Sequence, residues 1–148
     1  DLKNNPRSRR IMTNIYNHAD LHEMHLYPCA YSMTFNVTGN KLNAILNQRS
    51  QDMLTANNWN VCQYSALTLM LAQVTGFEPG EFVHVIADAH IYDRHIDLVK
   101  GVMEKEPFKA PKVRLNPDVK DFYDFTVDDF IVEDYEFHKL GKKVPVAI

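Results

Sequence analysis

The stretch from Val61 to Thr75 constrains the fold of this chain more than any other. Leu67, Leu71 and Val74 recur in it at helical spacing, and Gly76 follows as a residue suited to the left-handed conformation that ends many helices. The stretch is apolar on nearly every side, so an isolated helix here would leave much apolar surface in water. The pattern therefore predicts a long, buried, central helix with other elements packed around it.

Short segments of alternating apolar and polar residues surround this helix in the sequence. Residues 31–37 and 42–46 alternate in this way, and Thr38-Gly39-Asn40 between them is typical of a tight turn, which predicts a β-hairpin. Further strands are predicted at residues 10–16, 82–86, 112–115 and 130–135, and a second helix from Asp93 toward Glu104. Strands interleaved with helices predict an α+β fold with a mixed sheet packed against helices.

The length and composition indicate one globular domain over residues 1–148. A hydrophobic content of 45% is enough for a core, and a net charge of −3 with no basic block argues against a nucleic-acid surface. No apolar run reaches the roughly 18 residues that span a bilayer. Two cysteines form at most one disulfide, which argues against a secreted domain held together by several disulfides. We expect a cytoplasmic protein with free thiols and neither a membrane nor a nucleic-acid polymer as partner.

Pro28-Cys29 places a thiol at the end of a predicted loop, about twenty residues before Arg49-Ser50. A single cysteine is more often a small buried residue than a nucleophile, and thiolate chemistry needs a positive charge nearby. Arg49 would supply that charge if the fold brings it close to Cys29. Arginine also offers a planar fork of donors that matches a phosphate, and the Ser50 hydroxyl adds another donor. As an isolated pair, Arg49 and Ser50 would more often be ordinary surface residues.

Arg7, Arg9 and Arg10 form a second cationic group within four residues. Such a group is either a solvated edge or a further contact to an anion such as phosphate.

His18, His22 and His25 stand at helical spacing and invite comparison with a zinc site. Tyr27-Pro28 follows at once, and the flanking residues carry no pattern of supporting ligands. We therefore expect no metal ion. Cys62 lies in the apolar helix, where core packing is its expected role.

Several short motifs acquire meaning in combination. Their order and spacing resemble those of thymidylate synthase, and the resemblance covers essentially the whole chain, as the C-terminal half or more of that family's sequence. They are Arg9-Arg10, Pro28-Cys29, Gln48-Arg49-Ser50-x-Asp52, Asn60, Asp88-x-His90-x-Tyr92 and the terminal Pro145-Val146-Ala147-Ile148.

The resemblance implies a role for each matching residue. Cys29 would attack C6 of the uracil ring of dUMP, so that C5 can take up the methylene carbon of the co-substrate 5,10-methylenetetrahydrofolate. Asn60 would read the uracil edge, and Asp52 would act beside these two in catalysis. Gln48, Arg49, Ser50, His90 and Tyr92 would bind the nucleotide, and Arg9 and Arg10 would reach the phosphate across a homodimer interface. Asp52, Trp59, Ala147 and Ile148 would contact the folate.

The chain also departs from the family pattern, mainly on the folate side. Trp59 stands where Phe is commonest, and residues 56–58 replace a Gly-x-Pro that usually shapes the folate wall. The family's N-terminal part, which supplies further phosphate and folate contacts, lies outside the sequence. Ala30 and Gln63 stand where His and Ser are common.

Three interpretations remain at this point. The first is a thymidylate synthase, which would transfer both a methylene carbon and a hydride. The second is a pyrimidine hydroxymethylase of the same fold, in which water takes the place of hydride, with Asn60 still favouring uracil over cytosine. The third is an inactive fragment that binds nucleotide or only dimerises.

Overall fold

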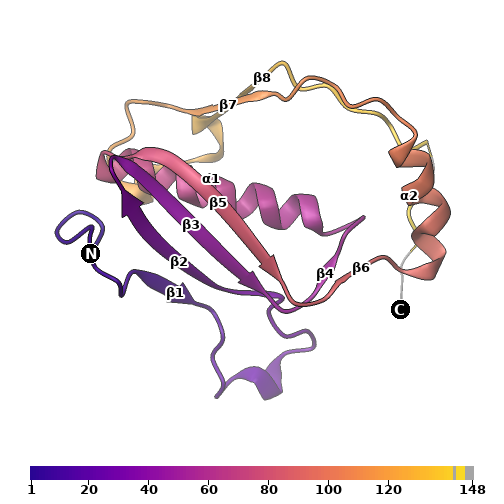
Figure 1. Cartoon of the computed structure of the whole chain (residues 1–148), viewed down its shortest axis with the longest axis horizontal. Helices are drawn as coiled ribbons and strands as arrows, with labels where there is room; N and C mark the ends of the chain where they lie inside the picture. Colours follow the sequence, from indigo (N-terminus) through magenta and orange to yellow (C-terminus); the bar gives the residue numbers. More distant parts are fainter. Residues whose placement is uncertain (142, 146–148) are drawn as a thin grey trace. The chain divides into compact units, whose positions relative to one another are not determined.

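The computed structural model describes residues 1–141 and 143–145. The chain divides into two compact units, Asp1–His90 and Ile91–Ile148, and each is described here by itself. All of the strands of the main sheet and the longest helix belong to the first unit (Figure 1).

The first unit is built on a four-stranded sheet with the order β1-β2-β3-β5. Its strands are β1 (Met12–Asn14), β2 (Ala30–Thr38), β3 (Lys41–Gln48) and β5 (Glu78–Ile86). β2 and β3 form the predicted antiparallel hairpin, with Gly39 at φ 62° in the turn. β3 and β5 run parallel, which requires a crossover, and the helix α1 (Asn57–Thr75) lies within it. The predicted mixed sheet is therefore confirmed, although β1 is shorter than expected.

Strand alternation places the core on the sheet face that α1 covers. Leu42, Ala44 and Leu46 of β3 are fully buried, as is Met33 of the neighbouring strand. Their side chains share one face because alternate residues of a strand point the same way. Ala72 of α1 belongs to the same buried cluster. This face is the apolar centre that holds the first unit together.

The helix α1 ends as predicted, but it is not buried all round. Gly76 has φ 79°, and its N–H bonds to the carbonyl of Gln73, while the N–H of Phe77 bonds to that of Ala72. Only Thr68 and Ala72 are buried among its residues. The helix packs against β3 and β5, so side chains turned away from the sheet remain exposed. Cys62 is one of them, and the prediction that it packs in the core is wrong.

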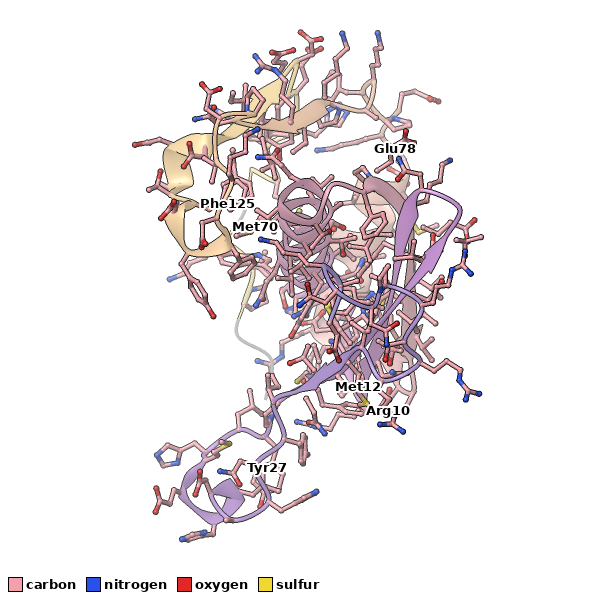
Figure 2. All side chains as sticks on the ribbon, turned by 90° about the vertical axis from the view of Figure 1, so that its left-hand side faces the viewer. Arg10, Met12, Tyr27, Met70, Glu78 and Phe125 are labelled. Carbon is pink, nitrogen blue, oxygen red and sulfur yellow. The ribbon has the colours of Figure 1, made fainter. Side chains whose placement is uncertain are left out.

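Two smaller pieces of the first unit flank the sheet. β4 (Gln51–Asp52) pairs in parallel with β6 (Ala89–His90), directly after β3 and β5 end. The loop between β1 and β2 contains a 3₁₀ turn, η1 (Leu21–Glu23), and projects away from the sheet together with Tyr27 (Figures 1 and 2).

The second unit contains one short helix and one ribbon. A 3₁₀ turn, η2 (Asp93–His95), leads into α2 (Ile96–Met103), which is shorter than predicted. β7 (Lys112–Leu115) and β8 (Phe130–Glu133) pair antiparallel, and two 3₁₀ turns, η3 (Phe122–Asp124) and η4 (Val127–Asp129), lie between them. The backbone N–H of Thr126 and neighbouring side-chain donors lower the pKa of Asp129 at this turn.

Among the described residues, no helix combines the length and the apolar character that crossing a membrane requires.

Candidate functional site

The open end of the β2–β3 hairpin brings Cys29 next to Arg49. Ala30 pairs with Gln48 at the last step of the ladder, and the N–H of Arg49 then donates to the carbonyl of Cys29 at 2.9 Å. Two residues that are twenty positions apart in sequence are thus neighbours across the hairpin.

The guanidinium of Arg49 is fixed by the loop that carries the thiol. Its Nε donates to the carbonyl of Pro28 at 3.0 Å, and its Nη2 donates to the carbonyl of Tyr27 at 2.6 Å. The same Nη2 lies 3.8 Å from the Sγ of Cys29, which is only partly buried. The arrangement places a fixed cationic donor beside the sulfur, which suits nucleophilic chemistry by a cysteine.

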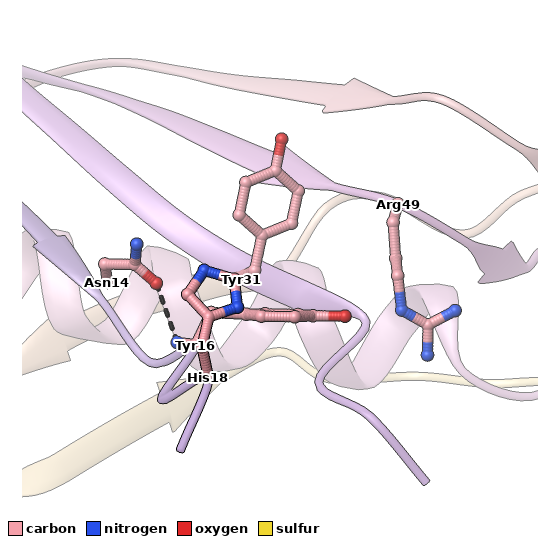
Figure 3. A pocket seen from close by; sticks show the side chains of 5 residues that line it. All are labelled: Asn14, Tyr16, His18, Tyr31 and Arg49. Atoms are coloured by element: carbon pink, nitrogen blue, oxygen red, sulfur yellow. Dashed lines mark hydrogen bonds between the residues drawn. The ribbon is translucent and has the colours of Figure 1, made fainter. Parts of the chain in front are cut away.

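Arg49 also lines two hollows on the surface of the first unit. One, with a volume of about 270 Å³, is formed with Asn14, Tyr16, His18 and Tyr31 (Figure 3). The Tyr16 ring packs edge-on against Tyr31, with centroids 6.1 Å apart. The other hollow, of about 450 Å³, lies along residues 24–27. The guanidinium is therefore anchored on one side and open to the surface on the other.

The neighbouring residue, Gln48, points into the core side of the sheet and organises a polar cluster there. Its Nε2 donates to the carbonyl of Ser50 at 2.8 Å and to Oδ1 of Asn60 at 3.3 Å. Its Oε1 lies 2.9 Å from Nε2 of His84 on β5. Gln48 is only 2% exposed, so these hydrogen bonds replace those that water would make. Burial lowers the pKa of His84 and so favours its neutral form.

The short β4–β6 pair brings Asp52 beside His90. The two are direct partners in the parallel ladder, and the N–H of Met53 donates to the carbonyl of His90 at 3.0 Å. Oδ1 of Asp52 accepts from the N–H of Leu54 at 2.9 Å, which fixes the carboxylate at the turn before α1. Nδ1 of His90 lies 3.4 Å from Oδ1 of Asp88.

The remaining predicted site residues are distributed more widely. Trp59, in the first turn of α1, is 78% exposed. Tyr92 is the second residue of the second unit, where its ring packs edge-on against His95 with centroids 5.8 Å apart. Ala147 and Ile148 lie outside the described residues.

Arg9 and Arg10 are exposed beside β1, where Figure 2 labels Arg10. Within residues 1–141 and 143–145, no ion pair or side-chain hydrogen bond joins either arginine to Arg49 or Cys29.

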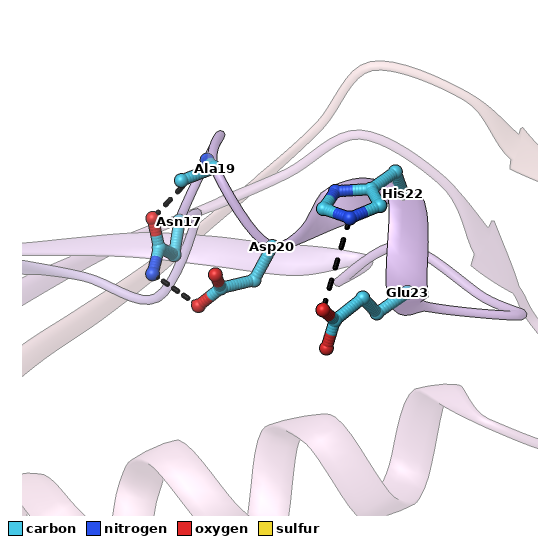
Figure 4. A network of polar contacts seen from close by, with 5 residues as sticks. All are labelled: Asn17, Ala19, Asp20, His22 and Glu23. Carbon is cyan, nitrogen blue, oxygen red and sulfur yellow. Dashed lines mark hydrogen bonds and ion pairs between the residues drawn. The ribbon is translucent and has the colours of Figure 1, made fainter.

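The three closely spaced histidines lie in the projecting loop and do not share a helix face. His22 pairs with Glu23 at 3.7 Å, and Asn17 bonds to Asp20 and to the N–H of Ala19 (Figure 4). The His18 ring instead lies against Tyr16. In the described part of the chain, no group of three or more metal-binding side chains comes together.

Sequence reasoning missed two polar residues near the site. His84 lies between Phe82 and Ile86 on the inward face of β5, a position that normally takes an apolar side chain. Gln51 is 1% exposed, and neither end of its carboxamide has a partner within the described residues. Nothing local in the sequence distinguishes Gln51 from an exposed glutamine.

Comparison with known proteins shows which sequences resemble the chain that carries this site. The family model described as thymidylate synthase matches residues 1–148. Thymidylate synthase 1 of Bacillus amyloliquefaciens is 49% identical over 146 residues, which cover 98% of this chain and 64% of that protein. Thymidylate synthase 1 of Bacillus subtilis (strain 168) is 50% identical over 135 residues, 91% of this chain and 48% of that protein.

A solved structure agrees with the sequence relatives. Thermostable thymidylate synthase A from Bacillus subtilis superposes with a TM-score of 0.90 at 47% identity, covering 99% of this chain and 52% of that one. The chain thus spans about half to two thirds of the length of the proteins that it matches. A family match over every residue, with the same fold, shows that the chain belongs to the thymidylate synthase family.

Proposed function

We propose that the protein containing this chain converts dUMP to dTMP by reductive methylation, with 5,10-methylenetetrahydrofolate as co-substrate. The observation that carries this proposal is the contact between Arg49 Nη2 and Cys29 Sγ at 3.8 Å. A thiolate beside a fixed cation is the group that covalent attack on a pyrimidine requires.

Cys29 acts as the nucleophile. Its thiolate adds to C6 of uracil, and the electron pair of the C5–C6 bond moves toward C5 and O4. C5 then bonds to the methylene carbon of the folate, whose bond to N10 breaks. Loss of the C5 proton breaks the bond between this carbon and N5, which releases tetrahydrofolate and leaves an exocyclic methylene group. Hydride transfer from tetrahydrofolate to this methylene expels the thiolate from C6 and gives a methyl group and dihydrofolate. Addition and elimination of sulfur divide one difficult substitution into easier steps.

The nucleotide is held by residues of several elements. Arg49 and Ser50 bind the 5′-phosphate, with Arg9 and Arg10 of a partner subunit completing the charge. His90 and Tyr92 bind the 3′-hydroxyl of the sugar. Asn60 donates to O4 and accepts from N3–H of uracil, and Gln48 supports it through the hydrogen bond at 3.3 Å. An amide can make both bonds at once, which favours uracil as the base.

The folate lies against residues on the other side of the nucleotide. Trp59 offers an exposed aromatic face for stacking, and Asp52 offers a carboxylate fixed at the turn before α1. Ala147 and Ile148 contact the co-substrate as well. No metal ion takes part.

The assembly is a homodimer in the cytoplasm. Met12, Thr34, Ile45 and Val83 form a cross-strand row on the sheet face opposite α1; three of the four are apolar, and Met12 and Val83 are exposed. An exposed apolar row on a sheet is typical of an interface, and a two-fold dimer is the commonest way to cover it. Both cysteines are free thiols, which is typical of a reducing compartment.

Product analysis with the full-length protein tests the proposal. Incubated with dUMP and methylenetetrahydrofolate, it is expected to release dTMP, identified by mass, with an equal amount of dihydrofolate. A hydroxymethyl product without dihydrofolate would identify a hydroxymethylase instead. Binding of dUMP without any product would leave only a nucleotide-binding protein.

A further inference from the structure

The orientation of the Gln48 carboxamide is fixed by a carbonyl group. The Ser50 carbonyl oxygen can only accept, so the Gln48 atom 2.8 Å away must be the Nε2 donor. Oε1 therefore occupies the other end of the amide, where it lies 2.9 Å from Nε2 of His84. A carboxamide oxygen cannot donate, so Nε2 of His84 must carry the hydrogen. One backbone carbonyl thus fixes both the amide direction and the histidine tautomer.

The same argument extends to Asn60. The second hydrogen of Gln48 Nε2 points to the Asn60 atom at 3.3 Å, which must be the acceptor Oδ1. The Nδ2 of Asn60 is then directed away from Gln48. The chain of donors and acceptors runs from His84 through Gln48 to Asn60, with Ser50 as its fixed reference point.

We propose that His84 is a positioning residue for base selection, which acts by locking Gln48 and, through it, the amide direction of Asn60. The inference rests on the proposed role of Asn60 as the residue that reads uracil. Uracil needs Nδ2 toward O4 and Oδ1 toward N3–H, whereas cytosine needs the amide reversed. Reversal would place two donors, Asn60 Nδ2 and Gln48 Nε2, against each other. Gln48 cannot turn in response, because its oxygen would then face the Ser50 carbonyl and its Nε2 would face the N–H of His84.

The site of His84 in the fold agrees with this role. It lies on β5 between Phe82 and Ile86, on the sheet face that packs toward α1, while Val83 and Val85 are exposed. An apolar side chain would fill this position at least as well, but it could not donate to Gln48. Burial also lowers the pKa of His84, so the ring can remain neutral where a charge would be costly.

The test compares affinities of the full-length protein for dUMP and dCMP, measured by calorimetry. His84→Leu leaves the buried Oε1 of Gln48 without its donor, so the carboxamide is held at one end only and can move away from Ser50 and Asn60. The preference for dUMP is then expected to fall on the order of tenfold, because the Asn60 amide loses the donor that opposes its reversal. His84→Gln restores a donor near the position of Nε2 and is expected to keep the preference within about threefold of the unmodified protein. Phe82→Leu, on the same face of the same strand, should lower the melting temperature and leave the preference unchanged.

The outcomes separate this inference from the proposed function. If the unmodified protein does not prefer dUMP, the proposed function fails. If it does, and His84→Leu keeps the full preference, His84 is not a positioning residue. Nitrogen-15 NMR of the unmodified protein decides the matter even if His84→Leu does not fold. The Nε2–H tautomer is expected, and an Nδ1–H tautomer would overturn the inference.

Discussion

At the scale of single residues, two consecutive side chains at the end of β3 contact two different groups of residues. Gln48 is buried and bonds to His84 and Asn60, whereas Arg49 turns to the loop that carries Cys29. Consecutive residues of an extended chain point to opposite sides, so one strand end contacts both Cys29 and Asn60.

Asn60→Asp is expected to reverse or strongly weaken the preference for dUMP over dCMP. One carboxylate oxygen can keep the bond from Gln48 Nε2, while the other replaces Nδ2 and accepts from the cytosine amine. A mismatched buried group costs about 1–3 kcal/mol, so the affinity ratio should change by roughly ten- to a hundredfold. The ratio is measured by calorimetry in the full-length protein. An unchanged ratio would show that another residue reads the base.

At the scale of elements, Asn43 and Gly80 set the register between the parallel strands β3 and β5. The Oδ1 of Asn43 accepts from the N–H of Glu81 at 2.9 Å, next to a register shift in the ladder. Gly80 lies so close that a Cβ there would meet Asn43 Oδ1 and would lie 2.8 Å from the carbonyl of Leu42. The close approach of the two strands therefore depends on the missing side chain.

Gly80→Ala is expected to lower the free energy of unfolding by about 1–3 kcal/mol, because the added carbon forces the strands apart. Gly101→Ala is the matched control, since a Cβ there meets nothing within 4 Å and the residue lies in α2. The control should be neutral or stabilising by up to about 1 kcal/mol. Urea unfolding of the two variants gives the comparison, and equal stabilities would show that Gly80 is not under steric constraint.

At the scale of elements, the sequence could predict those features that depend only on neighbouring residues. The hairpin turn at Gly39 and the helix end at Gly76 follow from the residues that tolerate a positive φ, and both were identified correctly. The exposure of Cys62 was not predictable, because it depends on which side of α1 the sheet covers. The link between Gln48 and His84 joins residues 36 positions apart and is visible only after the parallel pairing is known.

At the scale of the whole molecule, the motifs taken together predicted more about the site than any single residue could. Cys29 and Arg49 were predicted to act together, and the fold brings them into contact. Arg9 and Arg10 remain apart from that contact in the described chain, and no local pattern could say whether a partner subunit brings them to it. Their role across a dimer interface stays a prediction.

Mixing two inactive variants tests that role. The full-length Arg9→Ala variant keeps Cys29 but lacks the arginine that would enter the partner's site. The Cys29→Ser variant keeps that arginine but lacks the thiol. If Arg9 crosses the interface, random heterodimers contain one complete site, and the mixture should recover roughly a quarter of the parent turnover. Absence of recovery, with heterodimers demonstrated by native mass spectrometry, would place Arg9 in its own subunit's site or outside it.

The most direct test of the account is the effect of Cys29→Ser on turnover and on nucleotide affinity, measured on the same full-length preparation. An alcohol is a far poorer nucleophile than a thiolate near neutral pH, so formation of dTMP should fall to background. The dissociation constant for dUMP should stay within a few-fold, because Arg49, Ser50 and Asn60 are unchanged. Substantial remaining turnover would contradict the central claim that the Cys29 thiolate, held beside Arg49, carries the reaction.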